Sequence, residues 1–108
     1  MSSITPIWRG EPVLVLVCYD VNTEEKAGRA RLRKIAKTCE NYGQRVQFSV
    51  FECDIEKAQW VILRDKLLKI HKREEDSLRF YFMDEAVRSK VEHHGIGKPR
   101  DLREPLVV

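Results

Sequence analysis

The sequence predicts a single α+β domain in which two helices cover one face of a small sheet. A chain of 108 residues is long enough to bury one hydrophobic core. Short β-branched runs alternate with longer stretches of helical spacing, in the order strand, helix, strand or hairpin, helix, strand, strand. No apolar run approaches the roughly 20 residues needed to cross a bilayer, so we expect no membrane partner.

Composition and charge are typical of a globular protein with a mildly basic surface. Hydrophobic residues make up 43% and charged residues 34% of the chain, with a net charge of +3. This balance permits a phosphate-bearing partner without requiring one. Cys18, Cys39 and Cys53 are odd in number and lack C-x-x-C spacing, so we expect small core residues in a reduced, cytoplasmic protein.

Residues 1–12 lack the basic head and long apolar middle of a signal peptide. We interpret them as a leader or extension outside the fold. The single domain is expected to span residues 13–108.

The segment Val13–Asp20 is predicted to be a central strand. Both of its faces are apolar from Val13 to Tyr19, so both need to be covered. Two helices can cover one face, and a second copy of the chain is the simplest cover for the other. The strand ends at Asp20, a place where sheet proteins often keep their chemistry. Asp is also an ordinary strand terminator, and position alone favours that second interpretation.

A first helix is expected to follow, with Asn22 as N-cap, Glu25 at capping-box spacing and Gly43 as its stop. Its buried face has apolar residues at helical spacing: Leu32, Ile35, Ala36, Cys39 and Tyr42.

The outer face of this helix carries cations at successive i+4 steps, with two more beside them: Arg29, Arg33 and Lys37, then Arg31 and Lys34. Such a row indicates phosphate contact only weakly, because most charged rows are solvated faces.

The segment Gln44–Cys53 is extended, and its periodicity leaves open one strand or two short strands joined by a tight turn. Asp54 is expected to cap a second helix, with Glu56 in its first turn. The inner face of that helix is predicted to hold Trp60, Leu63, Leu67 and Ile70, supported by Val61 and Leu68.

After this helix we expect a mixed-sign charged loop over His71–Asp76 and a strand over Leu78–Met83. A weaker strand is predicted around Val87–His93, followed by an irregular tail over residues 95–108. There is no P-loop, no G-x-G-x-x-G and no zinc-spaced cysteine pair.

Three segments together resemble one known family. They are Tyr19-Asp20-Val21 after an apolar strand, Arg31-Leu32-Arg33-Lys34 in a basic helix, and the long string from Asn41 to Cys53, NYGQRVQFSVFEC. From residue 13 onward the chain is similar to the CRISPR-associated protein 2 family, the smaller of the two core adaptation proteins. The leader departs from the family pattern.

The resemblance implies a ferredoxin-like βαββαβ fold with an extra C-terminal strand, and it favours a hairpin with its turn near Phe48-Ser49. It also implies a homodimer in which the tail, residues 95–108, crosses to the partner. In the family, the strand-end aspartates of both subunits face each other and hold a divalent metal. Asp20 is that residue here, and two such carboxylates suit magnesium.

The resemblance also implies the site residues. Tyr19, Asp20, Arg45 and Phe51 match catalytic positions, with Arg45 and Phe51 acting by phosphate contact and substrate positioning. A surface strand residue is the alternative for Arg45. For Phe51, a core or interface aromatic is equally supported. The nucleic-acid-binding candidates are Arg29, Arg31, Arg33 and Lys37.

Two functions follow as expectations. The first is a magnesium-dependent endonuclease that cuts RNA or duplex DNA during CRISPR adaptation. The second is a non-catalytic scaffold that bridges dimers of the integrase, the larger adaptation protein, and holds foreign duplex DNA. A generic ferredoxin-like ligand-binding domain is a distant third. Phosphate contacts carry no base information, so RNA and DNA stay open.

Overall fold

The computed structural model describes residues 12–83 and 92–95, and in this part of the chain it contains four strands and two helices. In chain order they are β1 (Pro12–Asp20), α1 (Lys26–Glu40), β2 (Gln44–Gln47), β3 (Val50–Glu56), α2 (Lys57–Ile70) and β4 (Ser77–Met83). The strands form one antiparallel sheet in the order β2-β3-β1-β4. This order confirms the predicted α+β, ferredoxin-like arrangement.

The segment whose periodicity left two possibilities open is a hairpin. β2 and β3 are joined by a turn at Phe48 and Ser49, as the resemblance implied. β1 begins at Pro12, one residue before the expected domain start. The predicted strand at 87–93 and the extra C-terminal strand fall mainly outside the described residues, and the described stretch 92–95 is not in a strand.

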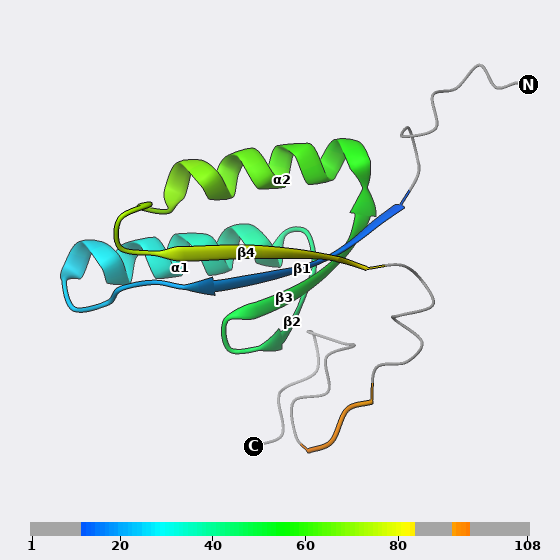
Figure 1. The fold of residues 1–108 in the computed structure, drawn as a ribbon, viewed down its shortest axis with the longest axis horizontal. Helices are drawn as coiled ribbons and strands as arrows, with labels where there is room; N and C mark the ends of the chain where they lie inside the picture. Colours follow the sequence, from blue (N-terminus) through cyan, green and yellow to red (C-terminus); the bar gives the residue numbers. More distant parts are fainter. Residues whose placement is uncertain (1–11, 84–91, 96–108) are drawn as a thin grey trace, which may run out of the picture.

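Both helices pack on one face of the sheet, and α1 lies beside α2 (Figure 1). The core lies between the helices and the sheet. It is lined by alternate residues of the strands and by one stripe from each helix: Val15, Val17, Tyr19, Phe51, Cys53, Ile55, Ile35, Cys39, Trp60, Leu63 and Leu67. Because strand side chains alternate between faces, Leu14, Leu16, Cys18 and Asp20 lie on the other side of β1. We call that side the distal face.

Two of the three cysteines predicted for the core are there, whereas Cys18 is half-buried on the distal face because of the alternation of β1. Cys39 and Cys53 are fully buried with free thiols, and burial raises the pKa of each to about 12. Gly43 lies so close to β3 that a side chain there would collide with the carbonyl oxygen of Glu52. The turn after α1 therefore needs a glycine.

Both predicted helix starts were wrong. The N-cap of α1 is Glu25, whereas the Asn22 side chain accepts a hydrogen bond from the Glu24 amide (2.9 Å) in the preceding turn. Asp54 lies within β3, because the strand continues until Ile55 has packed into the core. Glu56 is the N-cap of α2.

The second helix also buries a narrower stripe than predicted. Trp60, Leu63 and Leu67 are buried, whereas Val61 is 57% and Leu68 is 37% exposed. Those two residues point away from the stripe that meets the sheet. No helix in the described part of the chain is long and apolar enough to cross a membrane.

Candidate active site at the end of β1

Asp20 is the last residue of the central strand, and its carboxylate is free to accept a ligand. It is exposed and lies opposite Ser77 of β4 in the antiparallel register. Its side chain makes no hydrogen bond or ion pair with any described residue. The alternation of β1 places its side chain on the distal face, away from the core.

Two hollows meet at Asp20. The smaller, about 260 Å³, is lined by residues of β1 and β4, including Cys18, Arg79 and Tyr81. Nη1 of Arg79 donates to the Tyr81 hydroxyl oxygen at 2.9 Å, so the hollow that Asp20 lines also holds a cation. The larger, about 550 Å³, is lined by the loops before α1 and β4 and is rich in acidic side chains: Glu24, Glu74, Glu75 and Asp76.

The donor set of one chain does not complete a metal site. Among the described residues no group of three or more His, Cys, Asp or Glu side chains could hold an ion together. Asp20 supplies one hard oxygen donor of the kind that magnesium prefers. Two chains meeting at the distal face would supply two, so the residue type fits magnesium only in a dimer.

Tyr19, the neighbour of Asp20, points to the opposite side of the sheet and is buried. Its hydroxyl donates to the Phe48 carbonyl at 3.5 Å, and its ring stacks on Phe51. Burial raises the pKa of the Tyr19 hydroxyl to about 12 despite the nearby Arg45 cation. The hydroxyl therefore stays protonated at neutral pH and is not a general base there.

Arg45 belongs to the same cluster as Tyr19. Its Nη1 donates to the Phe48 carbonyl at 2.7 Å, and its guanidinium carbon lies 5.0 Å from the ring centroid of Phe51. Arg45 Nη2 also forms an ion pair with Glu40 Oε2 at 3.6 Å. With the Tyr19 amide donating to the Ser49 carbonyl at 3.1 Å, these contacts fasten the hairpin turn to the end of β1.

The structure thus divides the four predicted catalytic residues. Tyr19, Arg45 and Phe51 form one cluster on the helix side, and Asp20 stands on the distal face. Phe51 is completely inaccessible to solvent, which is the core position that the sequence left as an equal alternative. Arg45 retains a side-chain exposure of 28%.

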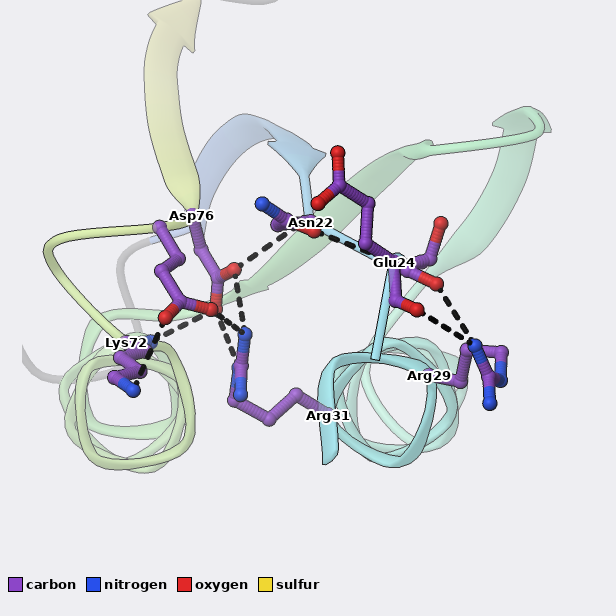
Figure 2. Close-up of polar contacts among 8 residues, drawn as sticks. Asn22, Glu24, Arg29, Arg31, Lys72 and Asp76 are labelled. Carbon is purple, nitrogen blue, oxygen red and sulfur yellow. Dashed lines mark hydrogen bonds and ion pairs between the residues drawn. The ribbon is translucent and has the colours of Figure 1, made fainter. Parts of the chain in front are cut away.

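The predicted nucleic-acid-binding residues also separate into two groups. Arg33 and Lys37 are exposed, and their side chains make no hydrogen bond or ion pair with the described residues. Arg29 folds back, its Nη1 donating to the Thr23 carbonyl at 3.0 Å and the Glu24 carbonyl at 3.3 Å. Arg31 turns toward the loop before β4 (Figure 2).

Asp76 accepts the hydrogen bonds of Arg31, and the sequence did not single out Asp76. Arg31 Nε donates to Asp76 Oδ2 at 2.7 Å and Arg31 Nη2 to Oδ1 at 3.1 Å, while the Asn22 and Lys72 amides donate at 3.2 and 2.8 Å (Figure 2). The hydrogen bonds from Arg31 are the main cause of a pKa of about 2 for the Asp76 carboxyl. In the sequence, Asp76 is one of several charged residues in a loop of mixed sign. The signal that could have identified it is its position just before a predicted strand.

The family model described as CRISPR associated protein Cas2 matches residues 13–91 of the chain. The chain belongs to the Cas2 family. The resemblance carried by the strand end, the basic helix and the segment from Asn41 to Cys53 is therefore confirmed.

Curated Cas2 proteins match over almost their whole length. The CRISPR-associated endoribonuclease Cas2 of Chlorobaculum tepidum is 62% identical over 96 residues, which cover 89% of this chain and 100% of that protein. The CRISPR-associated endonuclease Cas2 of Halalkalibacterium halodurans is 47% identical over 95 residues, with coverages of 88% and 99%.

Solved structures show the same fold. Cas2 of Streptococcus pyogenes has a TM-score of 0.69 at 50% identity, covering 76% of this chain and 99% of that one. A hypothetical protein from Thermus thermophilus has a TM-score of 0.67 at 31% identity, covering 82% and 99%.

Proposed function

We propose that this Cas2 chain is a magnesium-dependent endonuclease of CRISPR adaptation, cutting phosphodiester bonds in RNA or duplex DNA as a homodimer. The observation that carries the proposal is the exposed Asp20 carboxylate at the end of the central strand, which has no partner among the described residues. The relatives named endoribonuclease and endonuclease support the reaction class.

The homodimer follows from the distal face. Leu16 and Cys18 are apolar and only partly covered there, next to Asp20 on the same strand. A second copy packed on this face would cover them and bring a second Asp20 carboxylate. The site needs that copy, because one chain contributes a single ligand.

Each group has a defined task in this proposal. Asp20 of both copies would hold the cation, and magnesium, when bound, supplies a Lewis acid for a phosphodiester oxygen. Arg79, which shares the smaller hollow with Asp20, is placed to contact a phosphate. Tyr19 and Arg45 hold the hairpin turn against the strand end.

The test compares wild-type protein with Asp20→Asn on single-stranded RNA and on duplex DNA, with magnesium and with EDTA. Cleavage should be lost in the variant, while circular dichroism and light scattering stay unchanged. Asp65→Asn is the matched control, since it removes an exposed carboxylate from α2. Undiminished cleavage by rigorously purified Asp20→Asn protein would remove Asp20 from the catalytic role.

A second candidate is the non-catalytic scaffold, supported by Arg33 and Lys37 on α1, which are exposed and whose side chains have no partner in the part of the chain that the structure describes. A dimer presents this row twice, which suits duplex DNA held between integrase dimers. An array-integration assay with the integrase and Asp20→Ala protein separates the two functions. Retained integration favours the scaffold, and lost integration favours a catalytic or metal-dependent role.

A further inference from the structure

A buried carboxylate lies at the same end of the sheet as Asp20, held by a set of contacts that we call the Asp76 clamp. Its members are Asn22, Arg31, Lys72 and Asp76, which are labelled in Figure 2, and Glu75. The Asp76 side chain is 0% exposed and accepts hydrogen bonds at both oxygens from Arg31, Asn22 and Lys72. Glu75 adds an ion pair to Arg31 at 3.2 Å and one to Lys72 at 3.1 Å.

The clamp holds the chain that follows Asp20 and the start of the strand paired with it. Asp76 directly precedes Ser77, which is the register partner of Asp20. Asp76 also binds the amide of Asn22, two residues after Asp20. The exit of β1 and the entry of β4 are therefore joined through one carboxylate, next to the strand end that carries the candidate metal ligand.

Arg31 is the cation of this clamp, and its guanidinium is already paired with two carboxylates. Its side chain is 15% exposed, and Nε and Nη2 both donate to carboxylates. Paired, charge-assisted hydrogen bonds of this kind are among the strongest in proteins. A guanidinium committed in this way has little capacity left for a phosphate, in contrast to the exposed Arg33 two positions further along α1.

We propose that Arg31 is a positioning residue for the Asp20 site: by holding Asp76 it fixes the backbone that follows Asp20 and the start of the paired strand β4, and it does not bind nucleic acid. The expected effect on metal affinity rests on the proposed function, in which Asp20 binds the metal. The contact between Arg31 and Asp76 can be tested separately.

The experiment uses the full chain with four variants: Arg31→Gln, Arg31→Lys, Asp76→Asn and the control Arg64→Gln. Arg64 is exposed on α2 and has no partner among the described residues. Arg31→Lys and Asp76→Asn are conservative enough to keep the protein folded if Arg31→Gln does not. Three quantities are measured: Mn²⁺ affinity without nucleic acid, hydrogen exchange of the Asn22 amide, and the salt slope of duplex-DNA binding in EDTA.

We expect Arg31→Gln and Asp76→Asn to weaken Mn²⁺ binding about 10-fold, the lower end of effects seen when residues behind a metal ligand are changed. Both should speed exchange at Asn22 and leave the salt slope equal to that of Arg64→Gln. Arg31→Lys should restore part of the Mn²⁺ affinity, because it keeps a cation beside Asp76.

Two results would overturn the inference. One is a salt slope reduced by about 0.9 per lost contact in Arg31→Gln but not in Asp76→Asn, which would make Arg31 a phosphate ligand. The other is Mn²⁺ affinity and Asn22 exchange equal to the control in every variant. If wild-type protein neither binds Mn²⁺ nor cleaves, the proposed function fails. Hydrogen exchange of the Asn22 amide and the salt slope of DNA binding then still decide whether Arg31 holds the Asp76 clamp or binds phosphate.

Discussion

The rings of Tyr19 and Phe51 lie stacked, with centroids 6.3 Å apart and planes inclined by 20°. Tyr19 precedes the exposed Asp20, whereas Phe51 is completely buried in the core between sheet and helices. The contact links the strand end to the core. Loss of activity on changing Phe51 can therefore arise from loss of the fold.

Phe51→Ala should lower the free energy of unfolding by roughly 3–5 kcal/mol, the usual cost of removing a buried phenyl ring. Phe51→Leu should cost less and keep the protein folded with substantial cleavage. Urea denaturation and cleavage rates measured on the same samples check this. A Phe51→Leu protein of near-native stability that does not cleave would give Phe51 a direct role.

The distal face leads to a prediction about oligomeric state. Light scattering at micromolar concentration should give twice the chain mass of 12.7 kDa. Leu16→Glu, on that face, should reduce the mass to that of one chain or cause aggregation, because a charge would be buried between two sheets. Val61→Glu, on the exposed side of α2, is the control and should stay dimeric. A stable wild-type monomer would refute the dimer.

The exposed cations Arg33 and Lys37 of α1 predict salt-sensitive, sequence-independent binding of duplex DNA. Each phosphate neutralised contributes about −0.9 to the slope of log affinity against log salt. Replacing Arg33 and Lys37 together with Gln should flatten the slope and weaken binding similarly on unrelated sequences. Arg64→Gln should change neither. An unchanged slope in the double variant would show that this part of α1 is a solvated face.

The Asp76 clamp predicts a stability difference that depends on pH. The carboxyl pKa is lowered from 3.8 to about 2 in the folded chain, so its charged form stabilises the fold above pH 4. Asp76→Asn should lower the free energy of unfolding by roughly 2 kcal/mol at pH 7. That difference should shrink as the pH falls below 4 and be mostly lost near pH 2.

Urea denaturation of both proteins between pH 2 and pH 7 measures the effect. Asp65→Asn is the control, because Asp65 is 62% exposed and its ion pair is with Lys69, one helical turn away. A difference between wild type and Asp76→Asn that does not vary with pH would mean that the Asp76 charge contributes nothing to the fold.

The elements of this fold follow from local patterns. The apolar run from Val13 to Tyr19 predicted a central strand covered on both sides, and the stripe Trp60, Leu63 and Leu67 predicted the inner face of α2. Such periodicities repeat within a few residues, so they can be read without knowing what packs against them. The strand end at Asp20 and the family resemblance came from the same kind of local signal.

The roles of individual charged and aromatic residues depended on contacts between distant parts of the chain. Arg31 and Asp76 are 45 positions apart, and no spacing rule relates them. Arg31 and Arg33 are nearly equivalent in the sequence, yet only the first faces the loop that carries Asp76. Phe51 could be assigned to the core only once β3 was paired with β1, because that pairing places its ring beneath the helices and leaves Asp20 on the distal face.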